Sequence, residues 1–196
     1  MTDIPCVIFT GGKSSRMGED KAYLKFTKNQ TLLQYQYERL KQIFRHVYIS
    51  CKQQNPSIFK TQNIFDIDND IYAPTIGFIS AFEFLHVERF FAISVDTPFI
   101  SKKQIQTLIN QDQRNMDATI AKTKDKTHPL CGIYHKSLYP DFKQMLQNNR
   151  HKLQYLLQNS NTKYVAFEDL DNFLNINNPS QYKKALQLLH PHNNIY

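Results

Sequence analysis

The sequence contains very little glycine. Only five glycines occur in 196 residues, whereas glycine makes up about 7% of an average protein. Three of them, Gly11, Gly12 and Gly18, stand close together, and the other two are Gly77 and Gly132. A chain this poor in glycine is expected to keep it where the backbone needs unusual freedom or a close approach. We therefore predict a binding loop at residues 11–18 and expect Gly77 and Gly132 to lie near the ligand as well.

Cysteine is also scarce. The three cysteines, Cys6, Cys51 and Cys131, are far apart, and none forms a C-x-x-C pair. This pattern argues against a disulfide scaffold and against a structural zinc site. A reducing compartment, the cytoplasm, is the expected location.

Long apolar runs are missing as well. No stretch approaches the roughly 20 apolar residues that cross a bilayer, and residues 1–5 have no features of a secretory signal. Hydrophobic residues nevertheless make up 41% of the chain and aromatic residues 13%, which is enough to build a core. We expect one domain over residues 1–196, with residues 190–196 as a flexible tail.

The net charge is +7, from 24 Lys and Arg against 17 Asp and Glu. The excess is spread along the chain, without a block of like charges that would indicate a basic arm. No basic helix or aromatic-basic platform stands out, so nucleic acid is a disfavoured partner. A small polyanionic ligand is favoured instead.

Strand-like and helix-like segments alternate along the chain. Strands are expected near residues 4–9, 47–51, 63–66, 90–95, 117–121, 130–135 and 163–167, and helices near 31–45, 75–86, 101–111, 137–147, 152–158 and 179–189. This alternation predicts an α/β domain with a mostly parallel sheet. Ligands bind at the carboxyl ends of strands in such sheets, so the loops that begin at Gly11 and Asp96 are candidates.

The first candidate site is the loop at residues 11–21. Its glycines allow backbone N–H groups to approach phosphate oxygens, and Lys13, Arg16 and Lys21 add three positive charges. The segment matches neither the dinucleotide-binding G-x-G-x-x-G motif nor the Walker A spacing. We interpret it as a polyphosphate loop, with a basic surface turn as the alternative.

The second candidate is Asp96, which follows a buried apolar strand. Mg²⁺ is commonly held by one or two carboxylates together with substrate phosphates, so Asp96 is a candidate ligand; a simple turn before Pro98 is the alternative. Asp66, Asp68 and Asp70 form another acidic group, but they lack the glycine and the final glutamate of a calcium loop.

Two further segments carry polar side chains. His128 and Pro129 open an expected strand, where they could shape a pocket wall or form a plain turn. Asn175 and Asn177 alternate on an extended segment, so both amides point to one face and can bind a polar ligand. The alternative is a turn that starts the helix at Pro179.

Taken in order, these segments resemble a known family. The run 11–21, which ends Arg-Met-Gly-Glu-Asp-Lys, resembles the signature of nucleotidyltransferases with the glycosyltransferase-A-like fold, and most of all that of molybdenum cofactor guanylyltransferases. The segments 74–77, 95–100, 128–129 and 175–179 resemble later motifs of the same family. The resemblance covers about residues 4–189.

The chain departs from the family pattern at three places, one of which is the neutral Thr127 that precedes His128. Phe9 and Thr10 stand where the family usually has Leu-Ala, so a hydroxyl is added near the base contacts. Ala73 and Thr75 replace Gly and Leu around Pro74, which changes that turn.

The resemblance implies a fold, a reaction and a set of site residues. The fold is a Rossmann-like three-layer sandwich with a mostly parallel mixed sheet, as in nucleotide-diphospho-sugar transferases. The implied enzyme transfers GMP from GTP to the terminal phosphate of molybdenum-molybdopterin and releases pyrophosphate, with Mg²⁺ as cofactor. The N-terminal half would bind GTP and the C-terminal half molybdopterin. The implied catalytic residues are Arg16, Lys21 and Asp96, with Asp96 as the metal ligand. The implied contacts with GTP are Phe9, Thr10, Gly11, Gly12, Lys21, Ser50, Asp66 and Asp96. The implied contacts with molybdopterin are His128, Asn175 and Asn177.

Several alternatives stay open. Another nucleotidyltransferase of the same fold, of the cytidylyl or sugar-nucleotide type, would share most of these motifs. A nucleotide-binding regulator without turnover is a second alternative. The expected partners are GTP, molybdenum-molybdopterin and transient cofactor-delivery proteins or molybdoenzymes; neither nucleic acid nor a membrane is expected.

Overall fold

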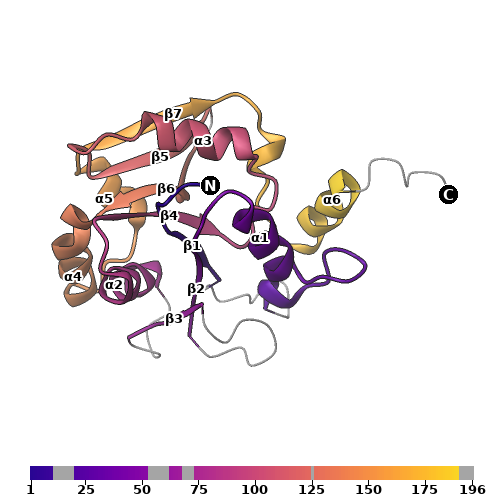
Figure 1. Ribbon diagram of the computed structural model, residues 1–196, viewed down its shortest axis with the longest axis horizontal. Coiled ribbons are helices and arrows are strands. Elements are labelled where there is room, and N and C mark those ends of the chain that lie inside the picture. Colours follow the sequence, from indigo (N-terminus) through magenta and orange to yellow (C-terminus); the bar gives the residue numbers. More distant parts are fainter. Residues whose placement is uncertain (11–19, 53–61, 68–72, 125, 190–196) are drawn as a thin grey trace.

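The computed structural model describes residues 1–10, 20–52, 62–67, 73–124 and 126–189. Strands and helices alternate along these residues, as the sequence predicts (Figure 1). The strands are β1 (Cys6–Phe9), β2 (Val47–Cys51), β3 (Asn63–Phe65), β4 (Arg89–Ser94), β5 (Ala118–Thr123), β6 (Thr127–His135) and β7 (Thr162–Phe167). The helices are α1 (Leu32–Lys41), α2 (Pro74–Leu85), α3 (Lys102–Gln111), α4 (Tyr139–Gln147), α5 (Leu153–Gln158) and α6 (Pro179–Leu189), with 3-10 turns η1 (Lys21–Tyr23), η2 (Lys136–Leu138) and η3 (Asp171–Phe173).

The seven strands form one mixed sheet in the order β3-β2-β1-β4-β6-β5-β7. Strands β1, β2, β3 and β4 run parallel to one another, and β5 runs parallel to β7. Only β6 runs antiparallel to both strands that flank it. The prediction of a mostly parallel sheet is confirmed.

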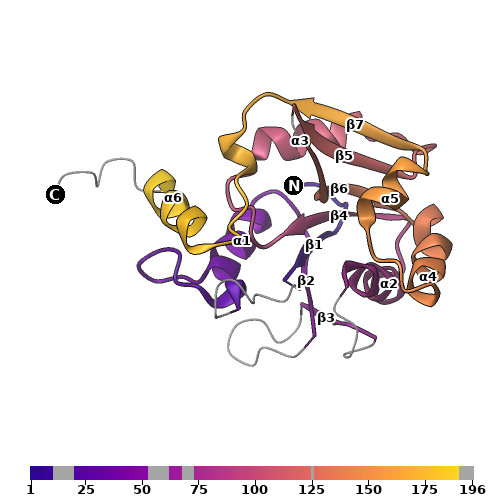
Figure 2. The same ribbon diagram turned by 180° about the vertical axis from the view of Figure 1, so that it is seen from behind.

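Helices cover both faces of the sheet, which gives three layers. Along β1, Cys6 and Ile8 belong to the core beneath α1 and α3, whereas Val7 and Phe9 belong to the core beneath α2, α4 and α5. All four side chains are buried, as expected for a central parallel strand with helices on each side. Figures 1 and 2 show α1 and α2 on opposite sides of the sheet.

Two of the helices, α1 and α3, begin where the sequence predicts, each after a residue that caps its first turn. The Thr31 hydroxyl accepts a hydrogen bond from the Gln34 backbone N–H, and the Gln34 side chain accepts one from the Thr31 N–H. Ser101 and Gln104 form the same reciprocal pair at α3. Such capping boxes satisfy donors that the first helical turn leaves unpaired.

Strand β6 starts earlier than the sequence predicts. A strand was expected over residues 130–135, yet pairing with β5 begins at Thr127. The register shifts at a bulge between Ile120 and Ala121, so β6 accommodates Pro129, which has no N–H to donate. His128 therefore lies within a strand and not in a turn before it.

Packing within the sheet explains why glycine occupies position 132. A Cβ added at Gly132 would lie 2.2 Å from the Thr119 carbonyl oxygen and 2.9 Å from the Ile120 Cα. We expected Gly132 to lie near the ligand. The structure instead explains this glycine by the close approach of β6 to β5 beside the bulge.

Candidate functional site

The candidate site lies where the parallel strands β1, β2 and β4 end. These strands finish at Phe9, Cys51 and Ser94, next to one another in the sheet. Because β6 is antiparallel to β4, its first residues reach the same edge. The carboxyl-end rule for ligand sites in α/β sheets therefore points to this edge.

A cluster of four polar side chains occupies this edge. The Lys21 ammonium lies 3.2 Å from Asp96 Oδ2 and donates a 2.7 Å hydrogen bond to Asn177 Oδ1. Asn175 Nδ2 approaches Asp96 Oδ1 at 3.5 Å. The side chains of Lys21 and Asp96 are only 18% and 14% exposed, so their attraction is screened less than that of a surface pair. We call these four residues the charged cluster.

Local backbone contacts place the members of this cluster. The Asp20 carboxylate accepts from the Ala22 N–H and caps η1, which begins at Lys21. The Ile176 N–H donates to the Asp96 carbonyl at 2.9 Å, and the Ile176 side chain is fully buried. The segment between Asn175 and Asn177 is thereby tied to the turn that carries Asp96.

Side chains of helix α1 also hold the turn at residues 94–97, which carries Asp96. Gln36, which is fully buried, donates through Nε2 to the carbonyls of Ser94 at 3.0 Å and Thr97 at 3.1 Å. Arg39 donates through Nε to Gln36 Oε1 at 3.2 Å and through Nη1 to the Ile100 carbonyl. Sequence reasoning missed this pair, although a glutamine in the buried stripe of α1 is the signal that would have found it.

A second group of predicted residues lies at the ends of β1 and β2. Thr10 donates to the Ser50 carbonyl through its backbone N–H at 3.2 Å and its hydroxyl at 2.9 Å. Phe9 is 4% exposed and stacks on Phe78 with ring centroids 4.6 Å apart. Its ring belongs to the core, so any ligand contact of Phe9 would come from its backbone, whose carbonyl already accepts from the Val95 N–H at 3.0 Å.

Asp66 follows β3 beside this group. Burial raises the pKa of Asp66 above its ordinary value, although the Lys52 charge and a hydrogen bond from Ser50 oppose the rise. Its Oδ1 atom is buried and has no hydrogen-bond partner within the described part of the chain. Asp66 Oδ1 is therefore a hydrogen-bond acceptor to which no described residue donates.

Gly77 in α2 packs closely against the same group. A Cβ at this position would lie 2.7 Å from Ser50 Oγ and 2.9 Å from Phe9 Cε1. Glycine here allows the helix to approach the ends of β1 and β2.

Other predicted residues lie outside the described residues. They are Gly11, Gly12, Lys13, Arg16, Gly18, Asp68 and Asp70, together with residues 190–196.

A pocket of about 410 Å³ opens beside the charged cluster. Asp96, His128 and Asn175, which sequence reasoning had assigned to the site, line it. Lys126, His151 and Lys152 line it as well, and sequence reasoning missed these three. Nothing in their local sequence distinguishes them from surface residues, because only the fold brings them together.

His128 forms part of the wall of this pocket. Its Nε2 lies 3.1 Å from the Thr123 hydroxyl, and its ring packs against Phe173 with centroids 4.6 Å apart. Burial, reinforced by the positive charge of Lys126, lowers the pKa of His128 to about 4. The imidazole is therefore neutral at pH 7.

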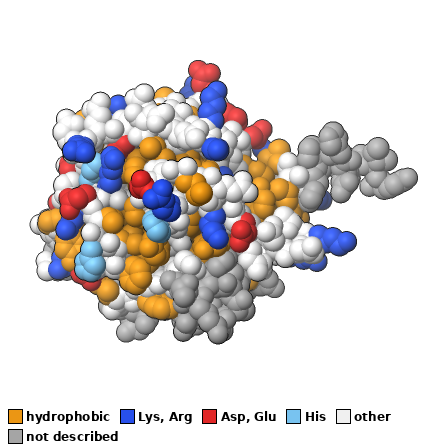
Figure 3. All heavy atoms as spheres, viewed as in Figure 1, with side chains coloured by type: hydrophobic (Ala, Val, Ile, Leu, Met, Phe, Trp, Pro, Cys, Tyr) orange, Lys and Arg blue, Asp and Glu red, His pale blue; other side chains and the backbone are white. Residues whose placement is uncertain are grey.

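Charged side chains of both signs are dispersed over the described residues on the face shown in Figure 3. Lysine and arginine do not gather there into one continuous basic patch.

Comparison with known proteins identifies the family. A family model described as "MobA-like NTP transferase domain" matches residues 6–163. The chain is 38% identical over 189 residues to the molybdenum cofactor guanylyltransferase of Campylobacter jejuni, covering 94% of this chain and 96% of that protein. The chain belongs to the molybdenum cofactor guanylyltransferase family. As a member of this family it is a nucleotidyltransferase, as the resemblance implied.

More distant members and fold neighbours agree with this placement. The molybdenum cofactor guanylyltransferase of Helicobacter pylori is 31% identical over 192 residues, covering 95% of this chain and 94% of that protein. The crystal structure of molybdopterin-guanine dinucleotide biosynthesis protein A from Archaeoglobus fulgidus shares the fold, with a TM-score of 0.82 at 20% identity and coverage of 96% and 100%. The predicted three-layer fold is confirmed.

Proposed function

We propose that this protein transfers GMP from GTP to the terminal phosphate of molybdenum-molybdopterin. A phosphate oxygen of the acceptor forms a bond to the α-phosphorus of GTP, the bond between that phosphorus and the β-phosphate oxygen breaks, and pyrophosphate leaves. The observation that carries the proposal is the charged cluster of Lys21, Asp96, Asn175 and Asn177 at the rim of a pocket sized for a small molecule.

The nucleotide would bind at the ends of β1 and β2. In this arrangement the backbone of residues 9–12 meets the base and ribose, and Arg16 and Lys21 neutralise charge on the triphosphate and the departing pyrophosphate. Positioning and charge neutralisation are the main contributions a protein makes to such transfers.

The donors around Asp96 suit a magnesium ion. Asp96 supplies a carboxylate, and Asn175 Oδ1 is a buried oxygen without a hydrogen-bond partner among the described residues. These are hard oxygen donors of the kind that Mg²⁺ prefers. When bound, Mg²⁺ would supply positive charge to the phosphate oxygens. Asp96 would hold it, and Lys21, which lies 3.2 Å from Asp96 Oδ2, would contribute a second positive charge.

The acceptor would occupy the pocket next to Asp96. Lys126 and Lys152 bring positive charge to its lining, which suits a phosphorylated acceptor. His128 would form a neutral wall, because its lowered pKa leaves it uncharged. Asn175 and Asn177 would bind polar atoms of the pterin, and the first and second halves of the chain would thus serve the two substrates separately.

Base selectivity would depend on Asp66. A carboxylate can accept two parallel N–H bonds from the edge of guanine that carries N1–H and the exocyclic amine, and the unpartnered Asp66 Oδ1 is suited to this. We expect Asp66→Asn to weaken GTP binding by about tenfold or more, since hydrogen bonds to charged groups each contribute roughly 1.5–3 kcal/mol. Binding of CTP should change far less. Calorimetric titration of both nucleotides checks this, and equal losses for GTP and CTP would contradict the assignment.

One assay tests the proposed function directly. Purified protein is incubated with GTP, Mg²⁺ and molybdopterin, and the dinucleotide and pyrophosphate are measured together. A thermal-shift series with GTP, CTP, ATP and UTP runs beside it. Equimolar dinucleotide and pyrophosphate are expected. A clear preference for CTP would favour a cytidylyltransferase, and binding without turnover would favour a regulator.

The proposed setting is the cytoplasm. Cys6, Cys51 and Cys131 are free thiols, in line with a reducing compartment. Among the described helices, none is both long and apolar enough to cross a bilayer. Cofactor-delivery proteins and molybdoenzymes would be transient partners.

A further inference from the structure

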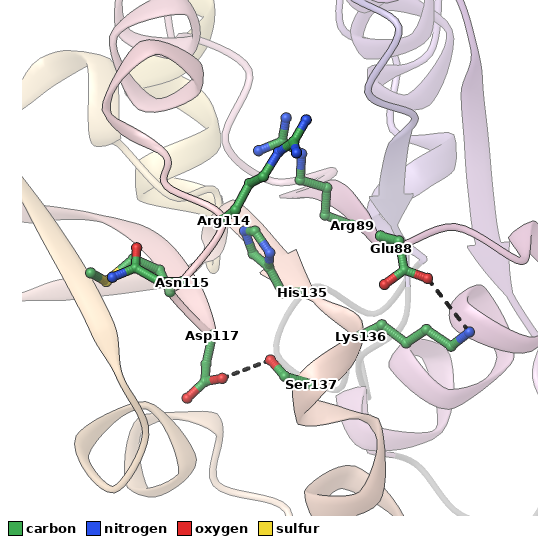
Figure 4. Close-up of a pocket in the computed structure, with 9 residues that line it drawn as sticks. Glu88, Arg89, Arg114, Asn115, Asp117, His135, Lys136 and Ser137 are labelled. Atoms are coloured by element: carbon green, nitrogen blue, oxygen red, sulfur yellow. Dashed lines mark hydrogen bonds and ion pairs between the residues drawn. The ribbon is translucent and has the colours of Figure 1, made fainter.

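A second pocket, of about 570 Å³, lies at the other end of β4. Its lining includes Arg89 at the start of β4, His135 at the end of β6 and Arg114 in the connection from α3 to β5 (Figure 4). Arg89 and Ser94, the two ends of β4, are five residues apart, or roughly 17 Å at 3.3 Å per strand residue, and Asp96 lies beyond Ser94. This second pocket can therefore be filled while the pocket beside Asp96 holds substrate.

A buried carboxylate contacts two of the residues that line the second pocket, Arg89 and His135. The Asp112 side chain is fully buried and accepts hydrogen bonds from the Arg89 guanidinium and, at 2.7 Å, from the Thr119 hydroxyl, while His135 Nε2 lies 3.0 Å from its Oδ1. Burial raises the pKa of Asp112, but these hydrogen bonds and the charges of His135 and Arg89 outweigh it, so the pKa is lowered. Asp112 is ionised at pH 7 and fixes Arg89 before any ligand binds.

The carboxylates that line the second pocket already have partners. Glu88 lies 3.8 Å from the Lys136 ammonium, and Asp117 accepts from the Ser137 hydroxyl at 2.6 Å and from the Asn161 N–H at 2.9 Å. Figure 4 shows the Glu88–Lys136 and Asp117–Ser137 pairs, with the arginine side chains pointing away from Asp117.

Arg89 and Arg114 bring positive charge to one part of the second pocket. Arg114 is exposed and has no ion-pair partner in the described part of the chain. Arg89 uses its Nη1 for Asp112, and its side chain remains 34% exposed. Arginine forks bind carboxylate and phosphate oxygens in pairs.

We propose that the second pocket binds a small oxyanion, the phosphate or carboxylate group of a small molecule, through Arg89 and Arg114. Asp112 acts by holding Arg89 in place, and Asp117 with Ser137 offers hydrogen-bonding groups to the rest of the ligand.

The test is calorimetric titration with inorganic phosphate and, separately, with citrate at matched ionic strength. Arg114→Gln removes the unpaired cation, and Lys103→Gln removes an exposed cation from α3 as the matched control. We expect Arg114→Gln to raise the dissociation constant about tenfold or more, with no change in Lys103→Gln. Weakening for phosphate alone would assign a phosphate ligand, and for citrate alone a carboxylate ligand. Absence of binding by the unmodified protein, or equal binding by both variants, would overturn the proposal.

A separate observation concerns Gln36 and Arg39 beneath the Asp96 turn. The two carbonyls that Gln36 binds, those of Ser94 and Thr97, flank Val95 and Asp96 on either side. Arg39 fixes the orientation of the Gln36 amide, because its Nε–H donates to Oε1 and leaves only the NH₂ group to face the turn.

We infer that Gln36 and Arg39 are positioning residues for Asp96. This inference rests on the proposed role of Asp96 in metal and nucleotide binding. Misplacement of a reacting group by about 1 Å can lower a rate about a hundredfold, so the carbonyl contacts are expected to act on kcat.

Two substitutions test the inference. Gln36→Met keeps the approximate shape of the side chain and removes the NH₂ group that donates to the two carbonyls. Gln36→Glu keeps the acceptor for Arg39 but places an oxygen against the two carbonyls. This second variant is used if Gln36→Met fails to fold. We expect kcat to fall at least tenfold at temperatures well below Tm, with weaker Mn²⁺ binding measured by electron paramagnetic resonance. A lower Tm with unchanged kcat and unchanged Mn²⁺ affinity would overturn the inference. If the unmodified protein shows no turnover, the proposed function fails, and the Mn²⁺ comparison still tests the positioning.

Discussion

Replacement of Asp96 by asparagine is expected to lower kcat for pyrophosphate release by about a hundredfold to a thousandfold, the range measured when one preorganised electrostatic group is removed. The size of Asp96 is preserved, and Asn177 still accepts from Lys21, so the fold should survive. Tm should change by only a few degrees, because a single partly buried contact is lost among many. Stopped-time pyrophosphate assays and circular dichroism melting give the two quantities.

The control for this variant is Asp3→Asn. Asp3 pairs with Arg45 on the surface, and its side chain is 80% exposed, so its removal should change neither rate nor stability measurably. Turnover by Asp96→Asn equal to that of the unmodified protein would rule out Asp96 as the metal ligand. A large loss of Tm would instead assign Asp96 to the fold.

The second large effect is expected from Gly132→Ala. The new methyl group would lie 2.2 Å from a backbone oxygen of the neighbouring strand, and a paired backbone cannot move aside as a side chain can. Overpacking of this kind costs about 3 kcal/mol, which corresponds to a fall in Tm of roughly 6–12 °C for a chain of this length. Thermal and urea melting measure the loss.

Gly77→Ala is the matched comparison. Its nearest neighbours are side-chain atoms of Ser50 and Phe9, which can shift, and alanine is favoured over glycine in a helix. We expect a smaller loss of stability than at Gly132 and a larger effect on nucleotide affinity. If Gly132→Ala melts like the unmodified protein, the requirement for close strand approach is refuted.

Local chemistry made much of the fold predictable. The capping residues Thr31 and Ser101 begin helices where expected because each satisfies backbone donors within its own turn. The alternation of strands and helices predicts the layers, because each element must bury one face. The position of β6 between β4 and β5 depends on pairing over long sequence separations, and no local pattern specifies it.

The candidate site was predictable only in part. Asp96, Asn175 and Asn177 stand out because polar residues follow an apolar strand or alternate on an extended segment. Lys126 and Lys152 do not stand out, because the local sequence around a lysine that lines a pocket does not differ from that around a lysine exposed to solvent. Gly132 was interpreted as part of the site, because sequence shows that glycine is required but not which neighbouring atom requires it.

The contact between Asp96 and Asn175 joins residues 79 positions apart in the chain. During synthesis the β4 strand and the turn after it emerge well before Asn175 and Asn177. The N-terminal strands can pair in this interval, but the Lys21–Asp96 pair lacks its two amide neighbours. A nascent chain that ends before Asn175 therefore lacks two of the four members of the charged cluster.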